Sequence, residues 1–296
     1  MSMKTIIMTG GTFGLGEATA KQLSATPGTQ LILGGRETRL PLELASLSRV
    51  RQFARQVLET LGKTKINALV LNAGLSFPKA ARTVDGYETT FAVNHLGHYL
   101  LLRLLAPALA REAIVVITTS NTHDPMFSPV APFPFVDAQQ LAQLDLGKGA
   151  QGGVAFEPGF RAYATSKLCN LLTARAFAAS AEVKARRLRV IAYNPGYIPG
   201  TGLGRNLPVG ALPAPAMALS PYFADVMRIQ AGEFLADLAL GRIVPPRGRL
   251  YASLVRGELT WPQPSELARR DDVAQQLWND SAVLVGMDSP APALVM

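Results

Sequence analysis

Tyr163 and Lys167 are the two side chains whose types and spacing best suit acid/base chemistry. They are four residues apart in the segment 161–183, whose apolar pattern predicts a helix, so they share one helical face. A free tyrosine has a pKa of about 10 and needs a nearby positive charge to exchange a proton at neutral pH. Since two such residues on a helix are more often a surface pair, their interpretation depends on what precedes them in the chain.

A glycine-rich turn, TGGTFGLG at residues 9–16, connects a predicted strand over 4–9 to a predicted helix over 15–24. Glycines at 10, 14 and 16 permit a tight turn and a close approach of the backbone to a pyrophosphate. The start of the following helix offers its free N–H groups to the same anion. The motif Asn72-Ala73-Gly74 follows a later predicted strand, 66–71. These placements favour a nucleotide site over a strained loop without a ligand.

The ordered set of motifs resembles the short-chain dehydrogenase/reductase family, whose fingerprint is T-G-x-x-x-G-x-G, N-A-G, a serine, Y-x-x-x-K and P-G. This chain has them at residues 9–16, at 72–74, at Ser120, at Tyr163 with Lys167, and at Pro195-Gly196. The resemblance is strong over about residues 3–201. Within the family the chain is most similar to the retinol dehydrogenase and protochlorophyllide reductase branch, on FAVNHLGH at 91–98, THDP at 122–125 and SKLCN at 166–170.

The resemblance implies roles for four catalytic residues. Tyr163 would pass a proton to a carbonyl oxygen as a hydride arrives, while Lys167 would lower the tyrosine pKa and bind the nicotinamide ribose. Ser120, after the buried strand 113–119, would hold the substrate oxygen. Asn94 would anchor a water leading from the lysine to solvent, although an asparagine in a helix is also commonly an exposed polar residue. The neighbouring hydroxyls Thr118 and Thr119 leave the register of the serine less certain than that of the tyrosine.

The end of the second predicted strand, 30–33, indicates the cofactor. The chain continues Gly34-Gly35-Arg36 and has no acidic residue before Glu37. An acidic side chain there would accept from the ribose 2′-hydroxyl of NAD, whereas a guanidinium forms a charge-assisted fork with the 2′-phosphate of NADP. We therefore predict NADP (NADPH), with a solvated loop arginine as the alternative reading of Arg36 and Arg39 as a substitute or second contact.

Further cofactor contacts follow from the family pattern. Glu43 stands where the family usually has an aspartate near the adenine, and Thr201 matches the threonine that follows P-G. The complete set of predicted cofactor-binding residues is Gly10, Thr12, Phe13, Gly14, Leu15, Gly16, Arg36, Glu43, Leu44, Asn72, Ala73, Gly74, Tyr163, Lys167, Pro195, Gly196 and Thr201.

The chain departs from the family between the second and third strands. Only five residues lie between Arg36 and Leu42, whereas a parallel crossover normally takes at least about 10. We expect the usual helix to be missing here and the third strand to be short or displaced. A more open adenine pocket and a lower cofactor affinity would follow.

Short strands and longer helices alternate along the whole chain, which predicts an α/β fold: a Rossmann-type, doubly wound parallel sheet in a single domain over 1–296. Further strands are predicted at 113–119, 189–193 and 250–254. Further helices are predicted at 47–61, at 87–110 as one long helix or a bent pair broken near Pro107, at 221–240 and at 265–278, the last with Ser265 as its N-cap.

Two proline-rich segments, 123–160 and 196–220, resist this periodicity and are expected to border the substrate site. The first carries Met126, Phe127, Phe133 and Phe135, and the second carries several leucines. We predict a bulky, uncharged, largely apolar carbonyl or alcohol substrate. The alternative is that these residues cap the core or form a dimer contact, so a homo-oligomer stays open.

Composition excludes several other classes of protein. The formal net charge is +8, but the one tight basic cluster, at 184–189, has no interleaved aromatic residue, so we expect no nucleic-acid partner. The single Cys169 allows no intramolecular disulfide and suits a reducing compartment. Neither a membrane span nor an export signal is recognisable, so a cytoplasmic protein is expected. His95 and His98 lack acidic or cysteine partners at ligand spacing, and no metal site is predicted.

The sequence therefore predicts an NADP-dependent carbonyl reductase or alcohol dehydrogenase. One alternative is a non-catalytic NADP-binding sensor or scaffold, against which the intact set of Asn94, Ser120, Tyr163 and Lys167 argues. Another keeps the same site but uses it for epimerisation or for reduction of a conjugated double bond.

Overall fold

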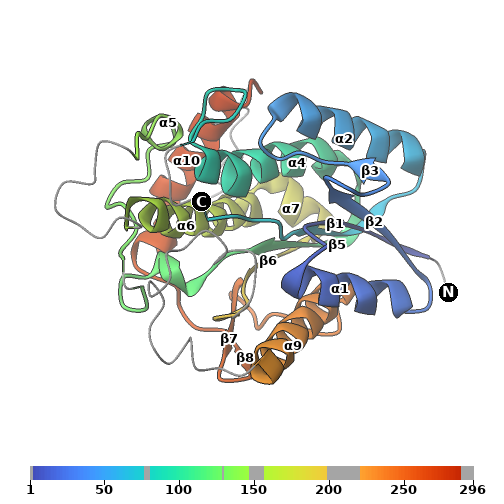
Figure 1. Cartoon of the computed structure of the whole chain (residues 1–296). Helices are drawn as coiled ribbons and strands as arrows, with labels where there is room; N and C mark the ends of the chain where they lie inside the picture. Colours follow the sequence, from blue (N-terminus) through green and yellow to red (C-terminus); the bar gives the residue numbers. More distant parts are fainter. Residues whose placement is uncertain (1–2, 77–80, 129, 147–156, 199–220, 288–296) are drawn as a thin grey trace.

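The computed structural model describes residues 3–76, 81–128, 130–146, 157–198 and 221–287, and strands and helices alternate through them (Figure 1). The strands are β1 (Lys4–Thr9), β2 (Thr29–Gly35), β3 (Leu40–Pro41), β4 (Ile66–Leu71), β5 (Leu109–Thr118), β6 (Arg189–Asn194), β7 (Tyr251–Val255) and β8 (Glu258–Thr260). The helices that matter below are α1 (Gly14–Ala25), α2 (Leu47–Leu61), α3 (Thr89–Phe91), η1 (Ala92–Leu96), α4 (Gly97–Leu105), η3 (Asn121–His123), α5 (Ala138–Ala142), α6 (Glu157–Ala179), α7 (Ala181–Arg186), α9 (Pro221–Leu240) and α10 (Asp271–Leu284).

Within the described residues the strands form one eight-stranded sheet in the order β3-β2-β1-β4-β5-β6-β7-β8. Neighbouring strands are parallel except β7 and β8, which pair antiparallel at the edge. The strand order reverses between β1 and β4, which is the topological switch point of a doubly wound sheet. The predicted Rossmann-type fold is confirmed, with the short edge strand β8 as an addition that the pattern did not predict.

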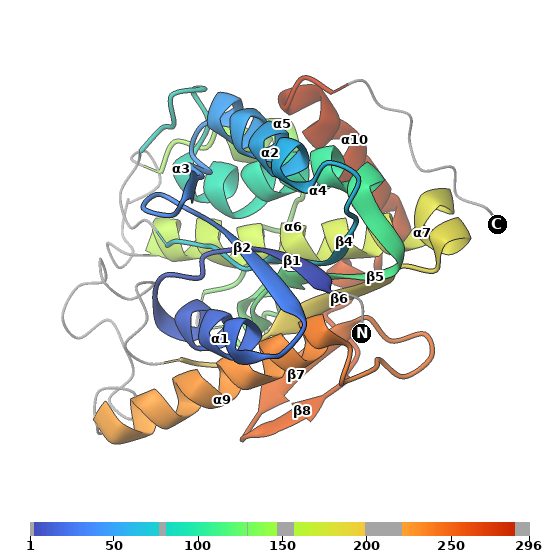
Figure 2. The ribbon, with the colours of Figure 1, turned by 90° about the vertical axis from the view of Figure 1, so that its right-hand side faces the viewer.

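Helices cover both faces of this sheet (Figure 2). Helices α2, α4, α6 and α10 lie on one face, and α1 and α9 lie on the other. Strand β4 and the second half of β5, from Ala113, are largely apolar and buried because both of their faces are covered, as a parallel sheet requires.

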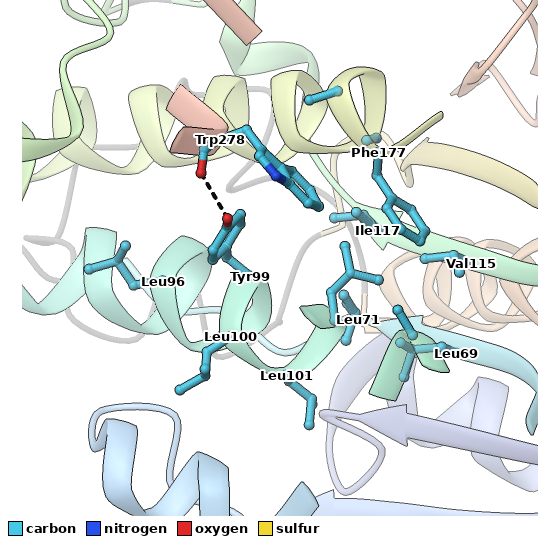
Figure 3. Close-up of a cluster of buried hydrophobic side chains, with 14 of the residues drawn as sticks. Leu69, Leu71, Leu96, Tyr99, Leu100, Leu101, Val115, Ile117, Phe177 and Trp278 are labelled. Carbon is cyan, nitrogen blue, oxygen red and sulfur yellow. Dashed lines mark hydrogen bonds between the residues drawn. The ribbon is translucent and has the colours of Figure 1, made fainter. Parts of the chain in front are cut away.

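The thicker helical layer is closed by α10, whose Trp278 lies between Tyr99 of α4 and Phe177 of α6 (Figure 3). The Trp278 and Tyr99 rings meet edge to face at 4.9 Å between centroids, and the Tyr99 hydroxyl donates to the Trp278 carbonyl at 2.8 Å. Phe177 stacks on the other side of the indole at 5.9 Å. This aromatic cluster attaches the C-terminal helix to the layer that carries the candidate site.

A tight turn over residues 36–39 connects β2 to β3. The Leu42 N–H donates to the Gly35 carbonyl at 3.0 Å, and the Thr38 hydroxyl lies within hydrogen-bond distance of the same carbonyl. Two register pairs, Gly34 with Leu40 and Gly35 with Pro41, then join the strands in parallel. The chain thus enters α2 after a very short third strand.

Two predicted elements differ from the structure. The segment 87–110 breaks near Pro107 as one alternative predicted, at a 3₁₀ turn over Ala106–Ala108, but the part before it is divided into α3, the π-helix η1 and α4. Leu109 already belongs to β5, where it pairs with Ile66. The last helix begins at Asp271, and its N-cap, Arg270, forms no capping side-chain hydrogen bond. Ser265 is therefore not an N-cap, and its backbone N–H instead donates to the His123 ring at 3.3 Å.

Candidate active site

The carboxyl ends of β1, β4, β5 and β6 meet at one edge of the sheet, where parallel α/β folds bind their ligands. Thr9, Leu71, Thr118 and Asn194 end these strands. Each strand is followed by one of the motifs singled out from the sequence, so the topology brings motifs from distant parts of the chain to a single edge.

The glycine-rich turn after β1 leaves space for an anion at the start of α1. Gly10 and Gly14 have φ angles of +71° and +64°, in the left-handed region that favours glycine. A Cβ at Gly16 would collide with the Gly10 carbonyl. The N-cap residue Phe13 forms no capping side-chain hydrogen bond, and Thr12 and Phe13 are exposed, while Leu15 is half-buried. This cradle fits a pyrophosphate held by the backbone N–H groups of the first helical turn.

The turn after β4 packs directly against the glycine-rich turn. The Asn72 amide donates to the Gly10 carbonyl at 3.1 Å, and a Cβ at Gly10 would lie 2.7 Å from the Ala73 Cα. A Cβ at Gly74 would lie 3.2 Å from the Lys167 Nζ. The two turns predicted to bind the cofactor are therefore neighbours, and the second reaches the lysine.

Arg36 lies exposed at the end of β2, next to the same turn. The Gly10 N–H donates to the Gly34 carbonyl at 3.3 Å, and a Cβ at Gly35 would lie 3.7 Å from the Thr12 methyl group. Arg39 is also exposed. Arg36 and Arg39 thus belong to a turn that lies next to the glycine-rich turn.

The two other residues predicted to lie near the adenine differ in exposure. Glu43 is exposed, and its carboxylate accepts the Ala45 N–H at 3.1 Å. Leu44 is buried in the core, and a Cβ at Gly97 would lie 2.8 Å from its carbonyl oxygen. Glu43 therefore binds within its own turn, while Leu44 anchors that turn against α4.

Tyr163 of α6 and Ser120 after β5 are both buried, and the Ser120 hydroxyl acts on the tyrosine hydroxyl. The Ser120 hydroxyl accepts the Thr122 N–H at 3.3 Å, since Ser120 is the N-cap of η3. Burial raises the pKa of Tyr163 to about 12, and the Ser120 hydroxyl acts in the opposite direction. The phenol is therefore protonated at neutral pH, which is the state that a proton donor needs.

Lys167 lies one helical turn after Tyr163 and is also buried. Its Nζ is 5.6 Å from the centroid of the Tyr163 ring and donates to the Thr118 carbonyl at 3.3 Å. Burial lowers the pKa of Lys167 to about 8. The pair predicted from the i, i+4 spacing thus lies inside the protein and is not a surface pair.

Asn94 is fully buried in the π-helix η1. Its side chain bonds to both the N–H and the carbonyl of Leu75, each at 2.8 Å, and donates to the Ser166 hydroxyl at 2.9 Å. The Ser166 hydroxyl donates to the Tyr163 carbonyl at 2.7 Å. Asn94 therefore connects the loop after β4 to the helix of Tyr163 and is not an exposed polar residue.

Pro195 and Gly196 follow β6 at the same edge. Gly196 has a φ of +75°, its N–H donates to the Asn194 side chain at 3.1 Å, and a Cβ there would lie 2.9 Å from the Leu254 carbonyl. Thr201 lies outside the described residues, as do the apolar residues of the second loop between 199 and 220.

The apolar residues of the first loop divide into two groups. Met126 and Phe127 are 82% and 62% exposed. Phe133 and Phe135 stack on each other at 5.3 Å and pack against the main core. Phe133 and Phe135 therefore cap the core, which is the alternative predicted above, whereas Met126 and Phe127 are accessible to a ligand.

Several residues that hold the site together were not predicted to contribute to it. The Thr9 hydroxyl accepts the N–H groups of Asn72 and Ala73, at 3.0 and 3.1 Å, and contacts His98 at 2.9 Å. The Asn170 amide donates to the Thr118 carbonyl, the same oxygen that Lys167 binds. Their partners are tens of residues away along the chain, so local periodicity carries no signal for them.

In the described part of the chain, no group of three or more His, Cys, Asp or Glu side chains could hold a metal ion. No described helix has both the length and the hydropathy that crossing a bilayer would require.

Comparison with known proteins agrees with this geometry. A family model described as short chain dehydrogenase matches residues 4–131. Protochlorophyllide reductase of Daucus carota is 30% identical, over 96% of this chain and 78% of that protein, and retinol dehydrogenase 13 of Homo sapiens is 27% identical, over 97% and 86%. A solved structure of an uncharacterised protein from Mycobacterium paratuberculosis has a TM-score of 0.68 and 25% identity, over 98% and 96% of the two chains.

Proposed function

Because the chain belongs to the short-chain dehydrogenase/reductase family, in the branch of protochlorophyllide reductases and retinol dehydrogenases, we propose that this oxidoreductase uses NADPH and acts on a carbonyl or alcohol group of a bulky apolar substrate. The observation that carries the proposal is the buried group of Tyr163, Ser120 and Lys167, with the Lys167 Nζ 5.6 Å from the Tyr163 ring, at the edge that also holds the glycine-rich turn.

When bound, the dinucleotide supplies or accepts the hydride. The backbone N–H groups at the start of α1 would hold its pyrophosphate, and Arg36 would pair with the 2′-phosphate. The turn 72–74, Lys167 and the Pro195-Gly196 turn would hold the remainder. The glycine-rich turn supports this assignment because a side chain at Gly10 or Gly16 would collide with the backbone of Ala73 or Gly10, and Gly14 has a positive φ, so only glycines permit this backbone path.

In the reducing direction Tyr163 donates its phenolic proton to the substrate oxygen. A pKa of about 12 keeps that proton in place until a stronger base forms next to it. The Ser120 hydroxyl orients the same oxygen, and the Lys167 ammonium, 5.6 Å from the ring centroid, stabilises the phenolate that is left. A proton from solvent then restores the phenol.

The exposed apolar pair Met126 and Phe127 supports an apolar substrate, because solvent-exposed side chains of this size gain free energy when a ligand covers them. Phe160 adds a third apolar group, with its ring 5.9 Å from that of Tyr163. A small charged substrate would find no matching partner among these three residues.

The test is an NADPH-consumption assay with hydrophobic ketones, aldehydes and quinones, alongside small oxo-acids, with product analysis. We expect turnover of the large apolar carbonyls and little with NADH. Cofactor binding without turnover of any carbonyl would favour a sensor or scaffold. Products with an inverted stereocentre or a saturated double bond would instead assign the site to epimerisation or to conjugated double-bond reduction.

A further inference from the structure

His98 of α4 is a buried imidazole that connects two segments of the candidate site. The side chain is 2% exposed. Its Nε2 lies 2.9 Å from the Thr9 hydroxyl, at the end of β1, and its Nδ1 lies 3.1 Å from the Asn94 carbonyl. One ring therefore connects the glycine-rich turn to the residue that holds the loop after β4.

Hydrogen-bond counting determines which ring nitrogen carries the proton. A threonine hydroxyl has one proton and two acceptor sites. The Thr9 hydroxyl accepts the N–H groups of Asn72 and Ala73, so its proton is directed at the His98 Nε2. Nε2 is then the acceptor, and the proton is on Nδ1, which donates to the Asn94 carbonyl. Every polar atom in this network has a partner.

The charge state of the ring agrees with this count. Burial lowers the pKa of His98 to about 4, and the nearby Lys167 charge acts in the same direction. Burial also lowers the pKa of His95, and the neighbouring His98 acts in the same direction, so that ring is neutral as well. The ring is thus a fixed neutral connector at neutral pH and exchanges no proton with substrate.

The π-helix η1 forms the other side of this network. The Gly97 N–H donates to the Ala92 carbonyl, five residues back, which is the wide turn of a π-helix. The carbonyl of Asn94, which lies in this π-helix, accepts the His98 ring N–H. The Asn94 side-chain amide donates to the Ser166 hydroxyl, which in turn donates to the Tyr163 carbonyl. A continuous set of hydrogen bonds therefore leads from Thr9 to the helix of the proposed proton donor.

We propose that His98 is a positioning residue that keeps the glycine-rich turn, the turn 72–74 and the helix of Tyr163 in one register. This inference rests on the proposed function, because the register matters for catalysis only if the turns hold a nicotinamide cofactor next to Tyr163. Misplacement of reacting groups by about 1 Å lowers rates by as much as a hundredfold.

His95 provides a matched control on the same helical segment. It is 1% exposed, and its Nε2 contacts the Ser281 hydroxyl of α10 at 2.8 Å, while its ring packs against Phe91 at 5.0 Å. The two histidines share residue type and burial, but only His98 contacts the cofactor turns.

The experiment compares His98→Phe with His95→Phe in the full chain, measuring Tm, the NADPH dissociation constant and kcat. We expect His98→Phe to weaken NADPH binding by about fivefold or more and to lower kcat by about tenfold to a hundredfold. His95→Phe should lower Tm and leave both other quantities nearly unchanged. Equal kinetic profiles for the two folded variants would show that His98 is merely structural and would overturn the proposal.

If His98→Phe does not fold, two other substitutions, each of which keeps one of the two hydrogen bonds of His98, still test the proposal. His98→Asn retains a donor toward the Asn94 carbonyl, and His98→Gln retains an acceptor toward Thr9, so each should lose part of the NADPH affinity. A wild-type affinity in both would contradict the inference.

A readout without cofactor separates this inference from the proposed function. The imidazole ¹⁵N shifts of the wild-type protein should show the neutral ring protonated on Nδ1 between about pH 5 and pH 9. The opposite tautomer, or a titration in that range, would overturn the inference whether or not NADPH binds. Failure of the wild-type protein to bind NADPH, with the expected tautomer present, would instead count against the proposed function.

Discussion

The layer beneath α10 and the carboxyl edge of the sheet are both buried, but different interactions stabilise them. Beneath α10, the rings of Tyr99, Phe177 and Trp278 pack together, and the indole N–H is buried with no partner among the residues that the structure describes. At the edge, the polar atoms of Thr9 and His98 are all paired. Ring packing stabilises the first region, whereas hydrogen bonds fix the backbone of the turns after the strands in the second.

This difference shows that burial alone does not identify a functional histidine or tyrosine. His95 and His98 are equally buried, and so are Tyr99 and Tyr163 within a few per cent. Their partners separate them: one of each pair contacts α10, and the other contacts the motifs at the edge. Substitutions in the first region should therefore change the free energy of unfolding, and substitutions in the second should change kinetics.

The largest effect is expected for Trp278→Ala, which removes the central ring of the aromatic cluster and should lower the free energy of unfolding by about 3–5 kcal/mol. Urea denaturation measures the change, and kcat of the remaining folded protein should be nearly wild type. Trp278→Phe is the matched control: it keeps a ring and removes the unpaired indole N–H, so its cost should be much smaller. Equal losses for both would argue against ring packing as the cause.

Tyr163→Phe should show the opposite behaviour. It removes the proposed proton donor and should lower kcat by more than about a hundredfold, while NADPH affinity stays close to wild type. Thermal denaturation serves as the control, since the phenyl ring still fills the same space and Tm should change little. Normal turnover in this variant would exclude the assignment.

Arg36→Ala examines the exposed end of the cofactor site. Loss of a charge-assisted contact to the 2′-phosphate should weaken NADPH binding by about fivefold to a hundredfold and leave NADH binding unchanged. Calorimetric titration with both cofactors provides the measurement, and Arg39→Ala tests whether the neighbouring arginine takes part. Similar losses for NADPH and NADH would remove Arg36 from this role.

The smallest effect is expected for Phe127→Ser on the substrate side. Because this ring is largely exposed, the free energy of unfolding should stay within about 0.5 kcal/mol of wild type. The KM for an apolar ketone should rise by about threefold to tenfold, if the substrate covers part of the ring. Phe135→Ser, in the half of the loop that packs on the core, should instead lower stability, and an unchanged KM in Phe127→Ser would exclude that contact.

The sequence predicts this molecule well wherever local periodicity determines the structure. The helix over 47–61 has the predicted bounds because its buried residues recur at helical spacing. The motifs at the strand ends also meet as expected, since parallel strands bring their carboxyl ends together. Local patterns determine both features.

The predictions from sequence fail where a contact with a residue far away in the chain determines the local structure. Ser265 resembles an N-cap, but its N–H is used by His123, 142 residues away. The segment 87–110 is rich in apolar residues, yet Leu109 lies outside the helices and pairs with Ile66 in the sheet. The hydrogen bond between Thr9 and His98 spans 89 residues. No local sequence pattern predicts these three contacts, because tertiary packing determines each of them.

The position of α10 in the chain also bears on synthesis. The Tyr99 hydroxyl binds a carbonyl 179 residues downstream, and the ring packs against an indole of the same late segment. A nascent chain that has emerged only as far as α9 therefore presents Tyr99 and Phe177 without their aromatic partner. Such apolar surface promotes aggregation while it is uncovered, and the helical layer is completed only once α10 has emerged from the ribosome.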